Sequence, residues 1–220
     1  MLVAKGSTIT TGRGKGTLES DHVVAKALEI VDREGLNGLT MRGLASELGV
    51  GVMTLYGHFR TKDELVELLT ERAISELEIP ETGSWDEQIH ELFTNLRELL
   101  KSHPSILEAD AARPLSGPAA LRAANASLGM LRSGGLDDDR AVSAMSSLIS
   151  FTFGSAMFRR NRDNEAGSEY ALRVRGADPD ELEHVSYLAP QMLERGTDDE
   201  FDFGLRIIVD GLVRTAEEDR

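Results

Sequence analysis

The sequence predicts an all-α protein. Apolar residues recur at the three- and four-residue spacing of helices, and no stretch alternates apolar and polar residues as a strand does. A serine or threonine followed three residues later by glutamate, a pattern typical of helix starts, occurs at Thr61, Ser84 and Thr197. Glycine and proline separate the helical stretches. We therefore expect helices joined by turns and loops.

Composition limits the class of protein. The chain has 220 residues, 40% of them apolar, which is enough for one large or two smaller buried cores. The absence of cysteine excludes disulfides, thiolate metal sites and thiol nucleophiles. No stretch reaches the ~18 apolar residues of a membrane span, and the first residues lack the apolar region of a signal peptide. We expect a cytoplasmic protein with no membrane partner.

The net charge of −14 is unevenly distributed. Residues 1–62 hold 8 Lys and Arg against 6 Asp and Glu, whereas the remainder holds 16 against 32. Only the N-terminal part can approach a polyanion such as a nucleic acid, and the acidic remainder should point away from it.

The N-terminal stretch, residues 1–19, is rich in small and polar residues that cannot build a core. It is either a flexible leader or an arm whose Arg13 and Lys15 reach phosphates or the minor groove. The first long helix should begin at Ser20 or Asp21 and end at Gly35. Its apolar positions are Val24, Leu28 and Val31.

Two short helices joined by a glycine-containing turn should follow. Thr40 is a suitable N-cap for a helix from Met41 to Leu48, and Gly49 can adopt the left-handed conformation that ends it. A second helix, from Gly51 to Phe59, should turn Leu55 and Phe59 inward. This arrangement is a helix-turn-helix, whose second helix can enter a DNA major groove.

These residues also carry a family resemblance. The stretch resembles the signature of the tetracycline-repressor (TetR) family of bacterial transcription regulators at Ala45, Gly49, Val50, Leu55, Tyr56, His58, Phe59, Lys62 and Leu65. Upstream, Ala27 to Gly35 and Gly38 to Thr40 resemble the first helix and loop of the family's DNA-binding domain. The resemblance implies an N-terminal three-helix DNA-binding domain and a C-terminal helical domain for ligand binding and dimerisation.

A helix from Lys62 to about Leu77 should connect the two domains. Its expected buried stripe is Leu65, Leu68, Leu69 and Ala73. The break at 79–83, which contains Pro80 and Gly83, predicts a DNA-binding domain over 20–79 and a regulatory domain over 80–220.

The regulatory domain should contain six more helices. We expect them near 84–103, 106–111, 119–132 and 141–158, from about 178, and from about 198 to 215, with a long loop over 161–177. The helix over 141–158 is apolar or small nearly all round and should be buried on more than one face. Its surplus apolar surface, with that of the last helix, predicts a homodimer. Gly204 and Gly211 mark a side of the last helix where a second backbone could come close.

The resemblance implies the DNA-contacting residues. Thr40, Tyr56, His58 and Lys62 match the positions that meet phosphates in the family. Arg42, Val52, Met53 and Thr54 fall where the family reads base edges. The implied partner is a double-stranded, palindromic DNA operator, from which a small molecule releases the protein.

The effector should be mostly apolar. The candidate lining residues are Leu92, Phe93, Leu96, Leu107, Met130, Phe151 and Met157, although the same residues could be ordinary core. His90, His103 and His184 are isolated in the sequence, so we expect no metal site and no cofactor.

The sequence contains no nucleophile elbow, phosphate-binding glycine loop or paired-carboxylate motif. The family resemblance implies a repressor, and the missing motifs give no support to an enzyme. An enzyme and a DNA-binding protein without an effector remain the alternatives on the same helical scaffold.

Overall fold

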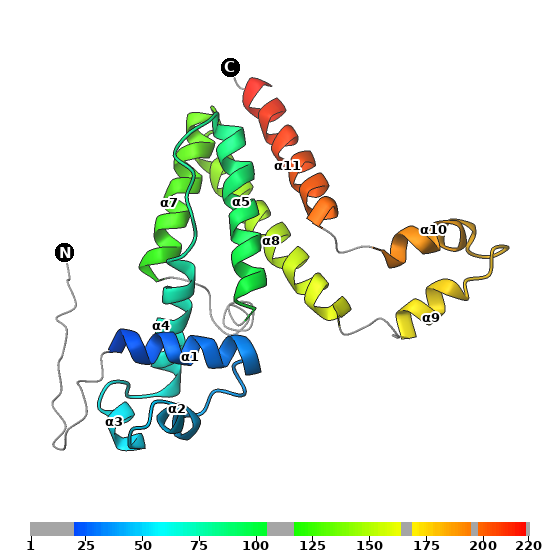
Figure 1. Cartoon of the computed structure of the whole chain (residues 1–220). Helices are drawn as coiled ribbons and strands as arrows, with labels where there is room; N and C mark the ends of the chain where they lie inside the picture. Colours follow the sequence, from blue (N-terminus) through cyan, green and yellow to red (C-terminus); the bar gives the residue numbers. More distant parts are fainter. Residues whose placement is uncertain (1–19, 105–116, 164–168, 195–197, 219–220) are drawn as a thin grey trace. The chain divides into compact units, whose positions relative to one another are not determined.

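A computed structural model describes residues 20–104, 117–163, 169–194 and 198–218. All regular elements within these ranges are helices, which confirms the all-α prediction (Figure 1). The described residues form two compact units. The N-terminal unit contains 20–76, 102–104 and 117–121, and the C-terminal unit contains the rest.

The N-terminal unit is built on α1 (Ser20–Glu34), which packs against α4 (Lys62–Ile74). In α1, Val24, Leu28 and Val31 are buried as predicted. The helix ends at Gly35, whose φ of 75° lies in the left-handed region that favours glycine.

The predicted helix-turn-helix is present as α2 (Met41–Glu47) and α3 (Val52–Tyr56). Gly49 has a φ of 66° in the turn between them. The second helix is shorter than the predicted range of 51–59, because the chain leaves helical geometry after Gly57 to reach Thr61, the extended N-cap of α4. Leu55 and Phe59 still face inward, with exposed fractions of 0% and 1%.

Helix α4 begins as the sequence predicts, since the Thr61 hydroxyl accepts a hydrogen bond of 3.1 Å from the Glu64 amide. Leu65, Leu69 and Ala73 are buried, but the expected burial of Leu68 is wrong, because this side chain is 41% exposed. Residues spaced by four form a narrow stripe on a helix, and Leu68 lies beside that stripe.

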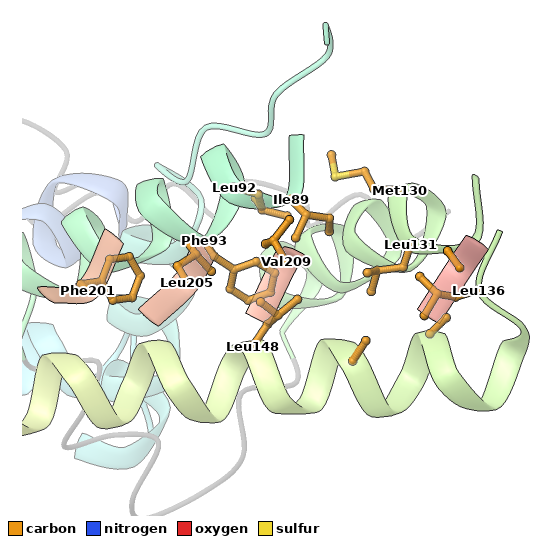
Figure 2. Packing of buried hydrophobic residues seen from close by; sticks show 13 residues of the cluster. Ile89, Leu92, Phe93, Met130, Leu131, Leu136, Leu148, Phe201, Leu205 and Val209 are labelled. Atoms are coloured by element: carbon orange, nitrogen blue, oxygen red, sulfur yellow. The ribbon is translucent and has the colours of Figure 1, made fainter. Parts of the chain in front are cut away.

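The core of the C-terminal unit lies between α5 (Trp85–Ser102), α7 (Pro118–Ser133), α8 (Asp138–Asp163) and α11 (Asp198–Glu218). Figure 2 shows Leu148 of α8, Phe93 of α5 and Leu205 of α11 meeting in this cluster. The start of α5 is fixed by Glu87, whose carboxylate accepts from the Ser84 amide at 2.8 Å. The hydrogen bonds from Ser84 lower the pKa of Glu87.

Three expectations for this unit are wrong. Residues 161–177 include the end of α8 and a further helix, α9 (Glu169–Arg175), in which Ala171 and Val174 are buried. The next helix, α10 (Glu183–Leu193), starts later than predicted, because Asp178 holds a turn by accepting from the Asp180 amide at 2.9 Å.

Helix α8 is buried on one face only within the single chain, contrary to the expectation. Ala141, Ala144 and Leu148 are buried, whereas Val142 and Ile149 are 51% and 37% exposed. The predicted short helix near 106–111 lies outside the described residues. No helix in the described part of the chain is both long enough and apolar enough to span a membrane.

Candidate nucleic-acid interface

The outer face of α3 is exposed and carries no charge. Met53 is 80% exposed and Tyr56 is 47% exposed, while Val52 and Thr54 are partly exposed. The inward face is fixed by Leu55, which is fully buried. The local sequence therefore presents two apolar side chains, a hydroxyl and a phenol to the surroundings.

Arg42 brings a positive charge to the adjacent helix, α2. Its side chain is exposed and forms no ion pair among the described residues. Between Gly35 and Lys62 the sequence has a single carboxylate, that of Glu47. This carboxylate lies 2.9 Å from Arg33 Nη2 and 3.9 Å from Lys26 Nζ, two cations of α1 that Glu34 and Glu29 also contact. The region from α2 to the start of α4 can therefore approach a polyanion.

The hydroxyl group of Thr40 can accept one hydrogen bond and donate another. Its Oγ1 accepts a hydrogen bond of 3.0 Å from the Gly43 amide, which caps α2. The hydroxyl proton stays available for donation, because a capping oxygen acts as the acceptor. Thr40 can thus hold the helix and donate to a phosphate at the same time.

Two of the predicted phosphate contacts also have partners within the chain. Lys62 donates from Nζ to the main-chain carbonyl of Leu36 at 2.7 Å. His58 Nδ1 lies 3.2 Å from the Ser20 hydroxyl. An ammonium group has three protons and an imidazole has a second nitrogen, so each side chain retains a group for phosphate. Arg13 and Lys15 lie outside the described residues.

Five of the seven predicted ligand-lining residues belong to one buried cluster in the C-terminal unit. Leu92, Phe93 and Met130 are buried there, and Leu96 and Phe151 pack against them. Met157 does not belong to the cluster and is 55% exposed. The seventh, Leu107, lies outside the described residues.

Sequence reasoning missed Arg97, which is only 2% exposed on the inner face of α5. Its Nη1 donates to Asp198 Oδ1 at 2.5 Å, and its guanidinium carbon lies 4.6 Å from the ring centroid of Phe201. The hydrogen bond from Arg97, followed by that from Lys101, lowers the pKa of Asp198 to about 2. The sequence held one signal of this burial, because Arg97 follows Phe93 by four residues and so lies on the apolar stripe of the helix.

Two of the three histidines expected to be isolated have carboxylate partners. His103 Nδ1 lies 2.8 Å from Asp32 Oδ2, and its Nε2 lies 3.3 Å from Glu76 Oε2. His90 Nε2 lies 2.9 Å from Asp202 Oδ1. These partners are distant in the sequence, so spacing could not reveal them. The described residues contain no group that could hold a metal ion.

Comparisons with known proteins identify the family of the chain. Residues 23–69 match the family "Bacterial regulatory proteins, tetR family", and residues 79–216 match the tetracycline-repressor-like C-terminal domain. The chain is 34% identical over 212 residues to the HTH-type transcriptional repressor DrrR1 of Streptomyces coeruleorubidus, a match that covers 90% of this chain and 78% of the relative.

Solved structures of similar fold belong to the same kind of regulator. Apo ActR from Streptomyces coelicolor has a TM-score of 0.81 and 31% identity, covering 94% of this chain and all of that one. ActR in complex with actinorhodin has a TM-score of 0.78 and 32% identity, with coverage of 90% and 98%. BioQ with its double-stranded DNA operator has a TM-score of 0.64 and 26% identity, with coverage of 90% and 99%. The chain belongs to the tetR family of bacterial regulatory proteins and is a DNA-binding transcriptional regulator, not an enzyme.

Proposed function

We propose that the protein is a dimeric repressor that binds a palindromic operator through α2 and α3 and leaves it when a small, mostly apolar molecule binds the C-terminal unit. The observation that carries the proposal is the exposed, uncharged face of α3 beside the exposed Arg42. We assign DNA binding to 20–79 and regulation to 80–220, a division supported by the two matched domains.

Base reading is assigned to Arg42, Val52, Met53 and Thr54. A guanidinium can donate two hydrogen bonds to the major-groove edge of guanine, and Arg42 is available for this because no acidic side chain engages it among the described residues. Val52 and Met53 offer apolar contact with a thymine methyl group. Thr54 can donate to or accept from a base edge.

Phosphate contacts are assigned to Thr40, Tyr56, His58 and Lys62. Each can present a hydrogen-bond donor, and Thr40, His58 and Lys62 do so while also making a contact within the N-terminal unit. Such contacts fix the position of the protein on the duplex without reading its sequence. Arg13 and Lys15 are proposed as additional contacts of the N-terminal arm.

Dimerisation is assigned to the exposed apolar residues of α8 and α11. Val142 and Ile149 of α8 and Phe203 and Ile207 of α11 are between 37% and 67% exposed. Large apolar side chains gathered on two long helices are typical of a face that a partner covers. A two-fold dimer would present two copies of α3, which requires an inverted repeat in the DNA.

Release from DNA is assigned to a ligand at the apolar cluster between α5 and α8. The solved complex of ActR with actinorhodin supports a small-molecule ligand for this fold. In a dimer, the two α3 helices must lie about 34–36 Å apart, or a multiple of this, to enter successive major-groove faces. A ligand that favours another spacing lowers affinity for the operator without touching a base.

Operator binding also implies a cytoplasmic location.

Titration of the operator complex with a library of small aromatic molecules tests the release step. A hit should lower operator affinity by about five- to 150-fold, the usual range of such coupling. Leu96→Trp should fill the apolar cluster and abolish the response while operator affinity stays within about twofold. If this variant responded to the hit as the natural protein does, the ligand would bind elsewhere.

A further inference from the structure

The loop between α3 and α4, residues 57–61, carries a cation to which no role has been assigned (Figure 1). Arg60 is exposed and forms no ion pair among the residues that the structure describes. It lies two positions after His58 and two before Lys62, both of which are assigned to DNA phosphates. Arg60 therefore brings a further positive charge to the proposed interface.

The main chain at Arg60 is held from both sides. Phe59 is 1% exposed and anchors the loop in the core of the N-terminal unit. Thr61 is the N-cap of α4, and its hydroxyl accepts a hydrogen bond of 3.1 Å from the Glu64 amide. The carboxylate of Glu64 in turn accepts a hydrogen bond of 2.7 Å from the Arg60 amide. The exposed Arg60 side chain therefore starts from a fixed point of the main chain.

The charge balance of this segment favours Arg60 over its neighbours as a phosphate contact. Residues 57–64 contain the cations Arg60 and Lys62 and the carboxylates Asp63 and Glu64, so their formal charges cancel. A phosphate is attracted here only by a cation that reaches beyond the two acids. The Lys62 ammonium is held against the unit, because it donates to a main-chain carbonyl at 2.7 Å. The Arg60 guanidinium has no such anchor among the described residues, and its planar fork can donate two hydrogen bonds to one phosphate.

From these contacts we infer that Arg60 is a further phosphate contact and that Glu64 positions it through the main chain. The inference rests on the proposed function, because it adds two residues to the proposed interface. A side chain that starts from a fixed main chain loses less freedom on binding, so the bond to Glu64 should raise affinity although Glu64 does not touch DNA. Since every duplex carries phosphates, the contact should act on all sequences alike.

Binding of a fluorescent duplex of random sequence to the full-length protein, followed by anisotropy, tests the contact. Arg60→Gln should lower affinity about tenfold at low salt, as expected for a charge-assisted hydrogen bond, and reduce the slope of log affinity against log salt by about one unit. Arg60→Lys should keep the slope, because it keeps the charge. The matched control is Arg175→Gln on α9, which removes the same charge from an exposed arginine of the C-terminal unit and should leave the slope unchanged.

Two variants of Glu64 test the positioning role. Glu64→Gln keeps an oxygen that can accept from the Arg60 amide, whereas Glu64→Ala removes it, and both variants lose the same charge. Glu64→Gln should therefore bind the duplex about fivefold more tightly than Glu64→Ala. In the Arg60→Gln background this difference should disappear, because no guanidinium remains to be positioned. A bond that only stabilised the fold would give no DNA effect that depends on the Arg60 side chain.

Equal salt slopes for Arg60→Gln, Arg175→Gln and the natural protein would overturn the inference. An equal difference between the two Glu64 variants in both backgrounds would overturn the positioning role. If Glu64→Ala failed to fold, the slopes of the Arg60 variants would decide alone. A natural protein that bound no duplex DNA would contradict the proposed function itself, whereas equal binding by the natural protein and Arg60→Gln would contradict this inference only.

Discussion

The side-chain ammonium of Lys62 donates a hydrogen bond of 2.7 Å to the main-chain carbonyl of Leu36. The bond joins the first residue of α4 to the loop between α1 and α2, 26 positions earlier. A residue assigned to phosphate binding therefore also holds the N-terminal unit together, and its removal should affect both DNA affinity and stability.

Lys62→Ala should weaken binding to all DNA sequences alike. Loss of one phosphate contact should reduce the slope of log affinity against log salt by about one unit. Loss of the Leu36 bond should lower the free energy of unfolding by about 1 kcal/mol. Fluorescence anisotropy at several salt concentrations and urea unfolding measure the two effects.

Lys26→Ala is the matched control for charge. This change also removes one cation from α1–α4, but Lys26 Nζ is engaged by Glu29 at 2.6 Å. The salt slope should change less than in Lys62→Ala. If Lys26→Ala and Lys62→Ala had equal salt slopes, the role of Lys62 would be structural only.

Arg42→Ala should act on specificity. We expect relaxed preference at one base position in each half-site, at a cost of about 1–3 kcal/mol for the preferred sequence. Binding to unrelated DNA should change much less. Affinities for all single-base variants of one half-site provide the measurement, and a uniform loss over those variants would make Arg42 a backbone contact.

Gly211→Leu should weaken dimerisation without harming the protomer. A Cβ at Gly211 would meet nothing within 4 Å in the single chain, so a side chain can begin there without a clash. Leucine also favours the helix over glycine by about 0.5–1 kcal/mol. Sedimentation should show more monomer. Gly129→Leu on α7 is the control, since that site is equally open. If Gly211→Leu dimerised as strongly as Gly129→Leu and the natural protein, the interface would lie away from Gly211.

Asp198→Asn should destabilise the fold in a pH-dependent way. The pKa of Asp198 is lowered from 3.8 to about 2, chiefly by the hydrogen bond from Arg97, so the charged pair stabilises the folded state above 3.8. That contribution is lost as pH falls through about 2, because the folded carboxyl group then takes up its proton. The difference in unfolding free energy between the two proteins should shrink from pH 5 to pH 2. A difference independent of pH would argue against the Arg97 pair as its source.

Local sequence was enough to predict the helix-turn-helix, because its determinants lie within a few residues. The Thr40 cap, the left-handed Gly49 and the inward pair Leu55 and Phe59 are all short-range features. Helix α9 was missed because its polar, glycine-flanked sequence resembles a loop and its buried residues are only Ala171 and Val174.

Contacts between distant positions were beyond a single sequence. Arg97 and Asp198 are 101 residues apart, and each alone is an ordinary charged residue of a helix. The same holds for His103 and Asp32, which are separated by 71 residues. Spacing rules apply within an element, so such pairs emerge only when the packing of the helices is known.

Selection of bound sequences from a random duplex DNA library tests the central claim most directly. The account predicts enrichment of an inverted repeat whose half-site centres are one helical turn, about 34–36 Å, or a multiple of it apart. The same selection with Arg42→Ala should lose preference at one symmetric pair of positions. No enrichment over the starting library, or enrichment of a single unrepeated site, would contradict the account.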